Sequence, residues 1–382
     1  MIEREVEKKI GKYLVGSSHK ILFVWGPRRS GKTTLLQKIG KEKGVKVFDF
    51  GLISDQEKFL PDITVLQKII KVGNLILIDE VQNYPEATAV LKVLFDHFKV
   101  KIIATGSSEL RQKTADFDSL AGRFEEVYCL PLSVSEVAKQ KNVLSYEEAA
   151  SSLEIAKEGQ IYGFYPEVYL EQDTNKKIEI LQNLVDTYVL KDIVSIYELR
   201  NTKLAKEILL KIALQLGSEV SVREIANSLQ TSPQTVANYL EIFVKNYILI
   251  CLPSFKTNAR RAISEHKKYF FYDLGIRNVL VSDFRSLDIR PDHGGVFENF
   301  IVSEIEKQRR NQAVKINVYF YREYSGKEVD IVLEDYQKKY VCLEVKTGKV
   351  KVVAPNFPLP HKLEVVRPDN YFAAISSMGL TK

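Results

Sequence analysis

Short apolar runs separated by polar stretches dominate the first third of the chain. Four of them carry the pattern, at residues 21–25, 75–78, 102–104 and 124–130. Apolar runs of this length are typical of strands buried on both faces of a parallel sheet. Leu35 and Leu36 begin a stretch with helical spacing after the first run. The pattern predicts an α/β domain with a parallel sheet over residues 1–131.

The turn between the first run and this helix has the form G-x-x-x-x-G-K-T. Its glycines let the backbone curl until N–H groups point at phosphate oxygens, and the helix adds its N-terminal dipole. We expect Lys32 to contact the β- and γ-phosphates of ATP and Thr33 to coordinate Mg²⁺. The predicted nucleotide-binding residues here are Gly26, Pro27, Arg28, Arg29, Ser30, Gly31, Lys32, Thr33 and Thr34.

Two carboxylates, Asp79 and Glu80, end the second run, at the sheet edge where ligands bind. We expect Asp79 to hold the Mg²⁺ shell and Glu80 to polarise the attacking water. At the end of the third run, Thr105 is the first candidate for a hydrogen bond to the γ-phosphate or the water, and Ser107 the second. A plain N-cap for the next helix explains this strand end equally well.

Residues 132–216 have mostly helical spacing, and we expect them to form a lid over the nucleotide. Residues 217–272 predict a winged helix-turn-helix. One short helix covers 221–229, Gln230 and Thr231 form the turn, and a second helix runs over 234–245 after the Ser232 cap and Pro233. Residues 247–253 and 267–273 predict the two strands of a wing.

This winged helix suggests DNA as a partner. Residues of the second helix that would face a DNA groove are Gln234, Thr235 and Asn238. The wing supplies basic residues suited to phosphate contacts, which are Lys256, Arg260, Arg261, Lys267 and Lys268. The alternative is a winged helix that couples domains structurally, because its second helix contains few basic residues.

Residues 273–382 combine carboxylates from a helix and a hairpin. Glu298 lies in a segment with helical spacing, whereas Asp330 and Glu344 lie on two strands joined by a short polar turn. Lys346 shares a strand face with Glu344. Glu298, Asp330 and Glu344 are predicted ligands of Mg²⁺ or Mn²⁺, and Lys346 is expected to orient water or stabilise phosphate charge. The alternative is a hairpin with alternating charges on a solvated face.

The order of the N-terminal parts resembles the AAA+ ATPases, with a phosphate loop, Asp-Glu, a polar strand end and an arginine before the last strand. The resemblance implies that Arg123 acts as an arginine finger on a neighbouring chain's nucleotide. Alternatively, Arg123 pairs structurally with Glu125 or Glu126, or senses its own nucleotide. The Asp…Glu-x-Lys arrangement at the other end resembles the PD-(D/E)XK nuclease fold, although Val329 replaces the proline of that pattern.

Along its whole length the chain resembles a prokaryotic family that joins an archaeal-type, AAA_14-like ATPase to a winged helix and a nuclease-like DUF4143 domain. The segments that carry this resemblance are 26–33, 120–123, 163–167, 269–275, 297–299 and 344–346. The resemblance implies an AAA+ core at 1–131, a lid at 132–216, a winged helix at 217–272 and a restriction-endonuclease-like α/β domain at 273–382.

Composition adds little to this picture. The chain is 45% hydrophobic and 27% charged, which is typical of globular proteins, and a net charge of +6 permits nucleic acid as a partner without requiring it. Three widely spaced cysteines form no metal-binding pattern and suggest a reducing compartment. Because no apolar run has membrane-spanning length, we expect a cytoplasmic protein with no membrane partner.

Two functional hypotheses follow. In the first, ATP hydrolysis gates or moves DNA, which the winged helix holds and the residues Asp330, Glu344 and Lys346 cut with a divalent metal. In the second, the chain is an ATP-driven switch whose C-terminal domain is an inactive binding module. An ATPase without a nucleic-acid role ranks third. A finger in trans would require a homo-oligomer.

Overall fold

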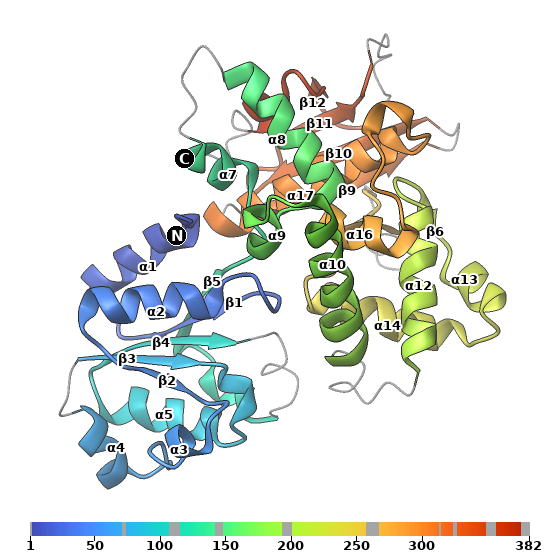
Figure 1. Ribbon diagram of the computed structural model, residues 1–382. Helices are drawn as coiled ribbons and strands as arrows, with labels where there is room; N and C mark the ends of the chain where they lie inside the picture. Colours follow the sequence, from blue (N-terminus) through green and yellow to red (C-terminus); the bar gives the residue numbers. More distant parts are fainter. Residues whose placement is uncertain are drawn as a thin grey trace. The chain divides into compact units, whose positions relative to one another are not determined.

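The computed structural model describes residues 2–70, 74–106, 115–141, 148–192, 201–256, 267–312, 315–323, 327–348 and 357–375 (Figure 1). It separates two compact units, Met1–Leu130 and Pro131–Lys382, which we describe one at a time. Three residues singled out above, Ser107, Arg260 and Arg261, lie outside the described residues.

The first unit is built on a five-stranded parallel sheet, which confirms the α/β prediction. Its strand order is β2-β3-β4-β1-β5, and its strands are β1 (Ile21–Trp25), β2 (Val47–Asp49), β3 (Leu75–Asp79), β4 (Lys101–Gly106) and β5 (Phe124–Tyr128). The apolar pattern identified all of them except β2, which has three half-buried residues and lies at the sheet edge. Such a short edge strand has no continuous apolar run to detect.

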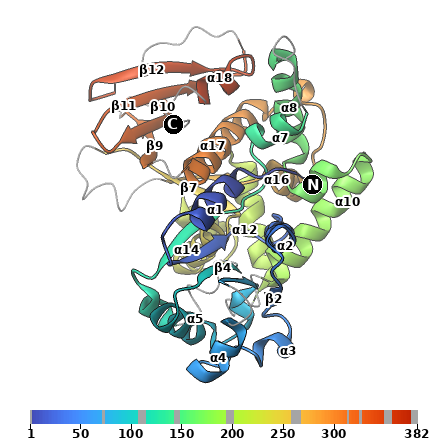
Figure 2. The ribbon, with the colours of Figure 1, turned by 90° about the vertical axis from the view of Figure 1, so that its left-hand side faces the viewer.

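Helices cover both faces of this sheet. The helices of the unit are α1 (Glu5–Val15), α2 (Lys32–Lys43), α3 (Ile53–Gln56), α4 (Ile63–Ile70), α5 (Ala87–His97), η1 (Val81–Asn83) and η2 (Ala115–Leu120). Figures 1 and 2 both show α1 and α2 on one side of the strands and α5 on the other. The core on the α1–α2 side includes Val6, Ile10, Leu36 and Ile103.

The second unit begins with helices that pack around one another. They are α7 (Val134–Gln140), α8 (Glu148–Tyr162), α9 (Pro166–Leu170), α10 (Thr174–Leu184), the π-helical segment η3 (Val185–Asp192) and α12 (Thr202–Leu214). There follow β6 (Glu219–Val220), α13 (Val222–Ser228), α14 (Pro233–Lys245), β7 (Leu249–Pro253) and β8 (Lys267–Phe271). These three strands form an antiparallel sheet in the order β6-β8-β7. One apolar core joins α10, α12, α13, α14 and the later helix α16 (Leu274–Val281).

The C-terminal part contains a long helix and a four-stranded sheet. Its elements are η4 (Leu287–Ile289), α17 (His293–Gln312), β9 (Ile316–Arg322), β10 (Glu328–Asp335), β11 (Tyr340–Val345), β12 (His361–Val366) and α18 (Tyr371–Ile375). The sheet order is β12-β11-β10-β9, with β11 and β12 parallel and the other pairs antiparallel. Phe255 ties β7 to this sheet, because its amide donates to the Phe320 carbonyl (2.6 Å) and its ring packs among Tyr319, Tyr340 and Phe357.

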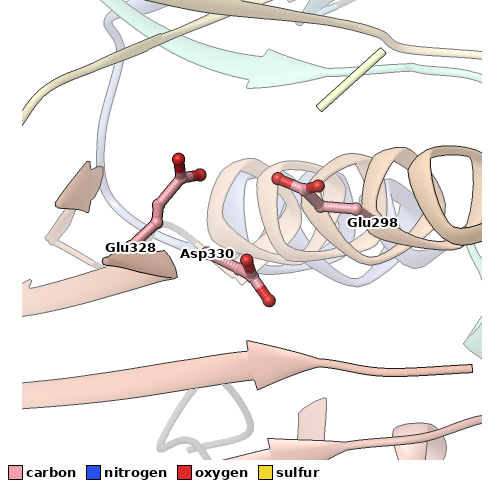
Figure 3. A group of neighbouring side chains, drawn as sticks. All are labelled: Glu298, Glu328 and Asp330. Atoms are coloured by element: carbon pink, nitrogen blue, oxygen red, sulfur yellow. The ribbon is translucent and has the colours of Figure 1, made fainter. Parts of the chain in front are cut away.

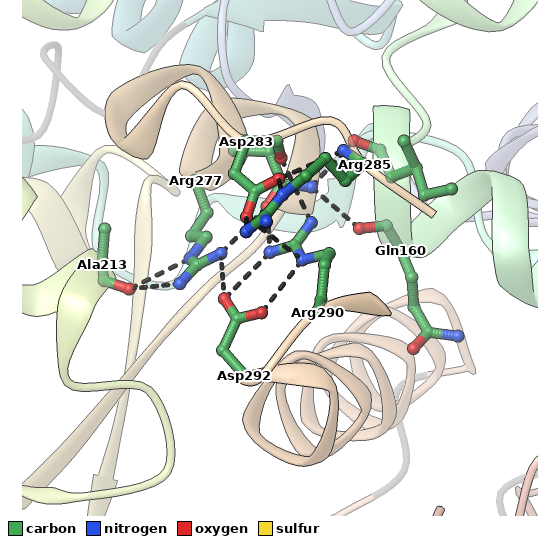
Figure 4. Close-up of polar contacts among 9 residues, drawn as sticks. Gln160, Ala213, Arg277, Asp283, Arg285, Arg290 and Asp292 are labelled. Atoms are coloured by element: carbon green, nitrogen blue, oxygen red, sulfur yellow. Dashed lines mark hydrogen bonds and ion pairs between the residues drawn. The ribbon is translucent and has the colours of Figure 1, made fainter. Parts of the chain in front are cut away.

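A buried arginine network joins helix ends in this unit (Figure 4). Arg277 donates to the carbonyl of Ala213 near the end of α12 at 2.8 and 3.0 Å and pairs with Asp292 at 2.7 Å. Arg290 also binds Asp292, through two hydrogen bonds of 2.9 Å. Because the last carbonyls of a helix lack partners within the helix, guanidinium donors stabilise the end of α12. We assign this network a structural role.

Candidate nucleotide site and carboxylate cluster

The phosphate loop connects β1 to α2 in a tight curl. Arg29 (φ 60°) and Gly31 (φ 97°) adopt left-handed backbone conformations. A β-carbon on Gly26 would lie 1.9 Å from the carbonyl oxygen of Cys129, so only glycine fits there. The Lys32 ammonium donates to the carbonyls of Gly26 (3.0 Å) and Pro27 (2.8 Å), and burial lowers its pKa. The structure therefore places the lysine inside the loop, where phosphate would meet it.

Five loop residues differ in exposure. Thr33 and Thr34, in the first turn of α2, are exposed together with Arg29, whereas Ser30 is buried. The Ser30 hydroxyl donates to the Pro27 carbonyl at 2.8 Å and so stabilises the curl from within. Arg28 is half-buried. The exposed threonine hydroxyls are accessible to a ligand.

The acidic pair and Thr105 meet at the same sheet edge, because β1, β4 and β3 are adjacent parallel strands. The Thr105 hydroxyl donates to the buried carboxylate of Asp79 and accepts from the Glu80 amide at 3.2 Å. In this arrangement Thr105 positions Asp79 and the backbone of Glu80. Its predicted contact with the γ-phosphate or with water stays a prediction.

Glu80 has a left-handed backbone (φ 53°), which is uncommon for a residue with a side chain. Its carboxylate accepts a hydrogen bond from the side-chain amide of Gln82. Residues held in such conformations cluster at functional sites, and Glu80 is the residue directly after the end of β3. Gln82 is therefore a candidate positioning residue that the sequence motif does not indicate.

Arg123 lies where β1 and β5 begin, at the opposite end of the strands from the phosphate loop. Its carbonyl accepts from the amide of Ile21, where β1 begins, whereas the phosphate loop follows the end of β1. The side chain pairs with Asp96 through contacts of 2.9 and 3.3 Å, not with Glu125 or Glu126 as one sequence alternative had it. Asp96 lies 27 residues away, so no local pattern indicated it. The position argues against Arg123 sensing its own nucleotide.

Arg4 is a further residue that the sequence did not indicate. It is buried and donates to the carbonyls of Ser30 (2.7 Å) and Leu130 (2.5 Å). It thus connects the phosphate loop to the end of the first unit. A charged N-terminal segment gave no signal for this, since the contact forms only after α1 packs on the sheet.

The residues predicted to contact DNA divide into two groups. Gln234 and Asn238 are exposed on α14 and hydrogen-bond to each other at 2.8 Å, and Thr235 is half-buried. Lys256 is half-buried and Lys267 is exposed. Lys268 is different: its side chain is 1% exposed, so the prediction that it contacts phosphate is wrong. Because side chains alternate along β8, Lys268 points inward. The carboxylates that it meets there stabilise its ammonium by more than burial destabilises it.

These carboxylates form a cluster with a membership that differs from the predicted metal site. Glu298 on α17 and Glu328 and Asp330 on β10 present oxygens within 4.8 Å of one another (Figure 3). Glu344 lies apart from this group, where it pairs with Lys346 at 2.8 Å. Lys346 also donates to Asp330 at 2.9 Å, so Asp330, Glu344 and Lys346 do meet. Glu328 is two residues from Asp330 on one strand face and was not among the ligands predicted from the sequence.

Two ammonium groups neutralise part of the cluster. Lys268 pairs with Glu298 at 3.2 Å and contacts Glu328, while Lys346 bridges Asp330 and Glu344. Burial raises the pKa of Glu298 to about 7, Lys268 opposes this shift, and Asp330 and Glu328 add to it. Burial also raises the pKa of Glu344. Each of the four carboxylates therefore has a lysine within contact distance.

A divalent cation fits this arrangement poorly. Carboxylate oxygens are suitable ligands for Mg²⁺ or Mn²⁺, but Lys268 occupies Glu298 and Glu328, and Lys346 occupies Asp330 and Glu344. The second oxygen of Glu298 packs against Gly217, where a β-carbon would lie 2.6 Å away. The pairing of these carboxylates therefore supports no metal-dependent catalytic step.

The other segments that carry the family resemblance connect helices and strands of the second unit. Buried Asp273 accepts from the amides of Phe164 (2.6 Å) and Gly275 (2.9 Å), and a β-carbon on Gly163 would lie 1.8 Å from it. Asn299 pairs with both backbone groups of Phe271 at 2.8 Å. Segments 163–167, 269–275 and 297–299 thus join α8, β8, α16 and α17.

Three family models match consecutive parts of the chain. An AAA domain model matches residues 18–138, and a domain of unknown function, DUF4143, matches residues 293–354. A second domain of unknown function, DUF8612, matches residues 135–288. The chain therefore carries an AAA-type ATPase domain, which implies nucleotide binding, followed by a DUF4143 domain.

Several relatives are similar over most of the chain. The uncharacterized protein MJ1544 of Methanocaldococcus jannaschii is 29% identical over 92% of this chain and 80% of its own length. An uncharacterized protein of Haemophilus influenzae is 24% identical over 82% of this chain and 79% of its own length. Both alignments extend well beyond the residues that the AAA domain model matches.

Solved structures give only distant likenesses. The Thermotoga maritima RuvB Holliday junction branch migration motor is 17% identical, with 65% of this chain and 89% of that chain covered and a TM-score of 0.30. The Saccharomyces cerevisiae Hsp104–ADP complex is 13% identical, with 82% and 43% covered and a TM-score of 0.34. TM-scores this low do not establish a shared fold.

None of the helices in the described part of the chain combines the length and apolar character needed to cross a bilayer.

Proposed function

We propose that the first unit binds ATP with Mg²⁺ and hydrolyses it. The observation that carries this proposal is the meeting of the loop lysine, which follows β1, with the acidic pair at the end of β3, only one strand away in the parallel sheet. The pKa of Lys32 is lowered by burial and raised by the charges of Glu80 and Asp79, so the three groups act on one another. Thr33 and Asp79 would hold Mg²⁺, and Glu80 would polarise water.

Nucleotide binding can be measured with the intrinsic fluorescence of Trp25, the single tryptophan of the chain. Trp25 is buried directly before Gly26, stacks on Phe23 and donates to Glu126 at 2.7 Å. ATP with Mg²⁺ is expected to change its emission, and phosphate release should follow. Absence of both signals at millimolar ATP would refute the proposal.

We further propose that residues 201–256 and 267–273 act as a winged-helix module that binds DNA. Two observations support this proposal: the order of the elements, α12-β6-α13-α14-β7-β8, and the exposed polar face of α14. Affinity should then fall with salt, and Gln234→Ala with Asn238→Ala should weaken it. A duplex affinity that does not change with salt would favour the structural-coupler alternative.

For the DUF4143 domain, the ion pairs favour the second hypothesis, a binding module without cleavage activity. The metal-dependent nuclease built on Asp330, Glu344 and Lys346 stays a prediction. Plasmid and single-stranded DNA with Mg²⁺ or Mn²⁺, with and without ATP, separate the two. Cleavage by wild type that is lost in Lys346→Ala would establish the nuclease, and absence of cleavage would leave an ATP-driven switch.

A further inference from the structure

Lys268 is a buried cation with a complete set of partners. Its side chain is 1% exposed, and its ammonium lies 3.2 Å from Glu298 Oε1 and in contact with Glu328 Oε1. The ring of Phe320 lies on a further side, with its centroid 5.3 Å from the ammonium. A buried ammonium is costly unless it is paired this closely, so the three contacts explain how β8 holds a lysine here.

The same contacts join three elements of the second unit. Lys268 comes from β8, Glu298 from α17 and Glu328 from β10. Gly217, between α12 and β6, closes the opposite side of the Glu298 carboxylate, since its φ of +74° and lack of a β-carbon leave room only for backbone. The ammonium thus sits where the three-stranded sheet, the long helix and the C-terminal sheet converge.

We propose that Lys268 is the resident cation of Glu298 and Glu328, two of the three carboxylates in the Glu298–Glu328–Asp330 cluster, and that it competes with divalent metal for these two. The cluster is then an ion-pair joint between β8, α17 and β10, and it accepts a metal only when the ammonium is absent. This inference does not depend on ATP hydrolysis or on DNA binding.

The test measures Mn²⁺ uptake by the full-length, nucleotide-free protein, read as loss of the free Mn²⁺ signal in electron paramagnetic resonance. Lys268→Gln should bind Mn²⁺ at least tenfold more tightly than wild type. Lys267→Gln is the matched control, because Lys267 is the exposed neighbour on the same strand, and it should behave as wild type. Adding Glu298→Gln to Lys268→Gln should abolish the gain and so assign it to this cluster.

Equal Mn²⁺ affinity in wild type and Lys268→Gln would overturn the proposal, and so would a gain that survives Glu298→Gln. If Lys268→Gln folds poorly, a second measurement, of melting temperature, still tests the proposal. Lys268→Gln alone should lower the melting temperature by roughly 5–10 °C, whereas Lys268→Gln with Glu328→Gln should recover part of that loss. Additive losses in the double variant would show that the two side chains are not coupled and would overturn the ion-pair joint.

Discussion

Arg123→Ala is expected to lower ATP turnover because Arg123 would contact the nucleotide that a neighbouring chain binds, not the nucleotide of its own chain. β1 runs from Ile21, which bonds to the Arg123 carbonyl, to Trp25, which precedes the phosphate loop. Five residue steps at about 3.3 Å place the loop roughly 16 Å from that end of the strand. An extended arginine side chain reaches only about 7 Å. Arg123 therefore cannot stabilise charge on its own chain's nucleotide.

The size of the expected effect follows from two considerations. The ion pair with Asp96 is about one-third exposed on both sides, so water screens it and its loss should cost little stability. A finger that completes a neighbour's site contributes on the order of 10³-fold in turnover. Arg123→Ala should thus bind ATP as wild type does and hydrolyse it roughly 10³-fold more slowly.

A mixing experiment distinguishes a finger acting in trans from every other explanation. Arg123→Ala keeps an intact phosphate loop, whereas Lys32→Ala keeps an intact arginine. Each variant alone should be inactive, and an equimolar mixture should recover activity because mixed neighbours supply both parts. Asp96→Asn serves as the control, since it breaks the ion pair and leaves the guanidinium available.

Two results would refute the reasoning. If Arg123→Ala retains full turnover in an assembly, the residue is structural. If the mixture stays inactive while Arg123→Ala still binds ATP, the finger does not act between chains. Turnover that is independent of protein concentration down to a demonstrated monomer would lead to the same conclusion.

Three further predictions concern the first unit. Lys32→Ala should weaken ATP binding at least roughly 100-fold in the Trp25 fluorescence assay, because the phosphates lose their buried cation; retained tight binding would contradict the loop assignment. Glu80→Gln should bind ATP normally and lower phosphate release by roughly 10²–10⁴-fold. Burial alone would raise the pKa of Asp55, but hydrogen bonds from Lys58, the Asp49 amide and Lys46 lower it to about 2. Asp55 should therefore contribute about 2 kcal/mol of stability above its unfolded pKa and lose it as pH falls toward 2. Urea unfolding followed by Trp25 should show Asp55→Asn less stable at pH 7 and equal to wild type near pH 2, and a gap that does not close would exclude this linkage.

Local signals in the sequence were enough to predict several parts of the fold. Apolar runs predict strands whatever they pack against, so β1, β3, β4 and β5 were identifiable. The G-x-x-x-x-G-K-T pattern lies in eight consecutive residues, so it indicates a phosphate loop whatever the rest of the fold, and the Ser232 cap with Pro233 marked the start of α14. The edge strand β2 lacked such a signal because its three residues are only half-buried.

The pairing of charged side chains, in contrast, depends on how the elements pack together. Lys268 looked like a solvated wing lysine because its neighbours in sequence are basic, but β8 turns it toward α17 and β10. The partner of Arg123 is Asp96 on α5, not the adjacent glutamates, and Arg4 reaches the phosphate loop after α1 packs on the sheet. Electrostatic pairing depends on distances of a few ångströms between residues far apart in sequence, so it follows from packing and not from local pattern.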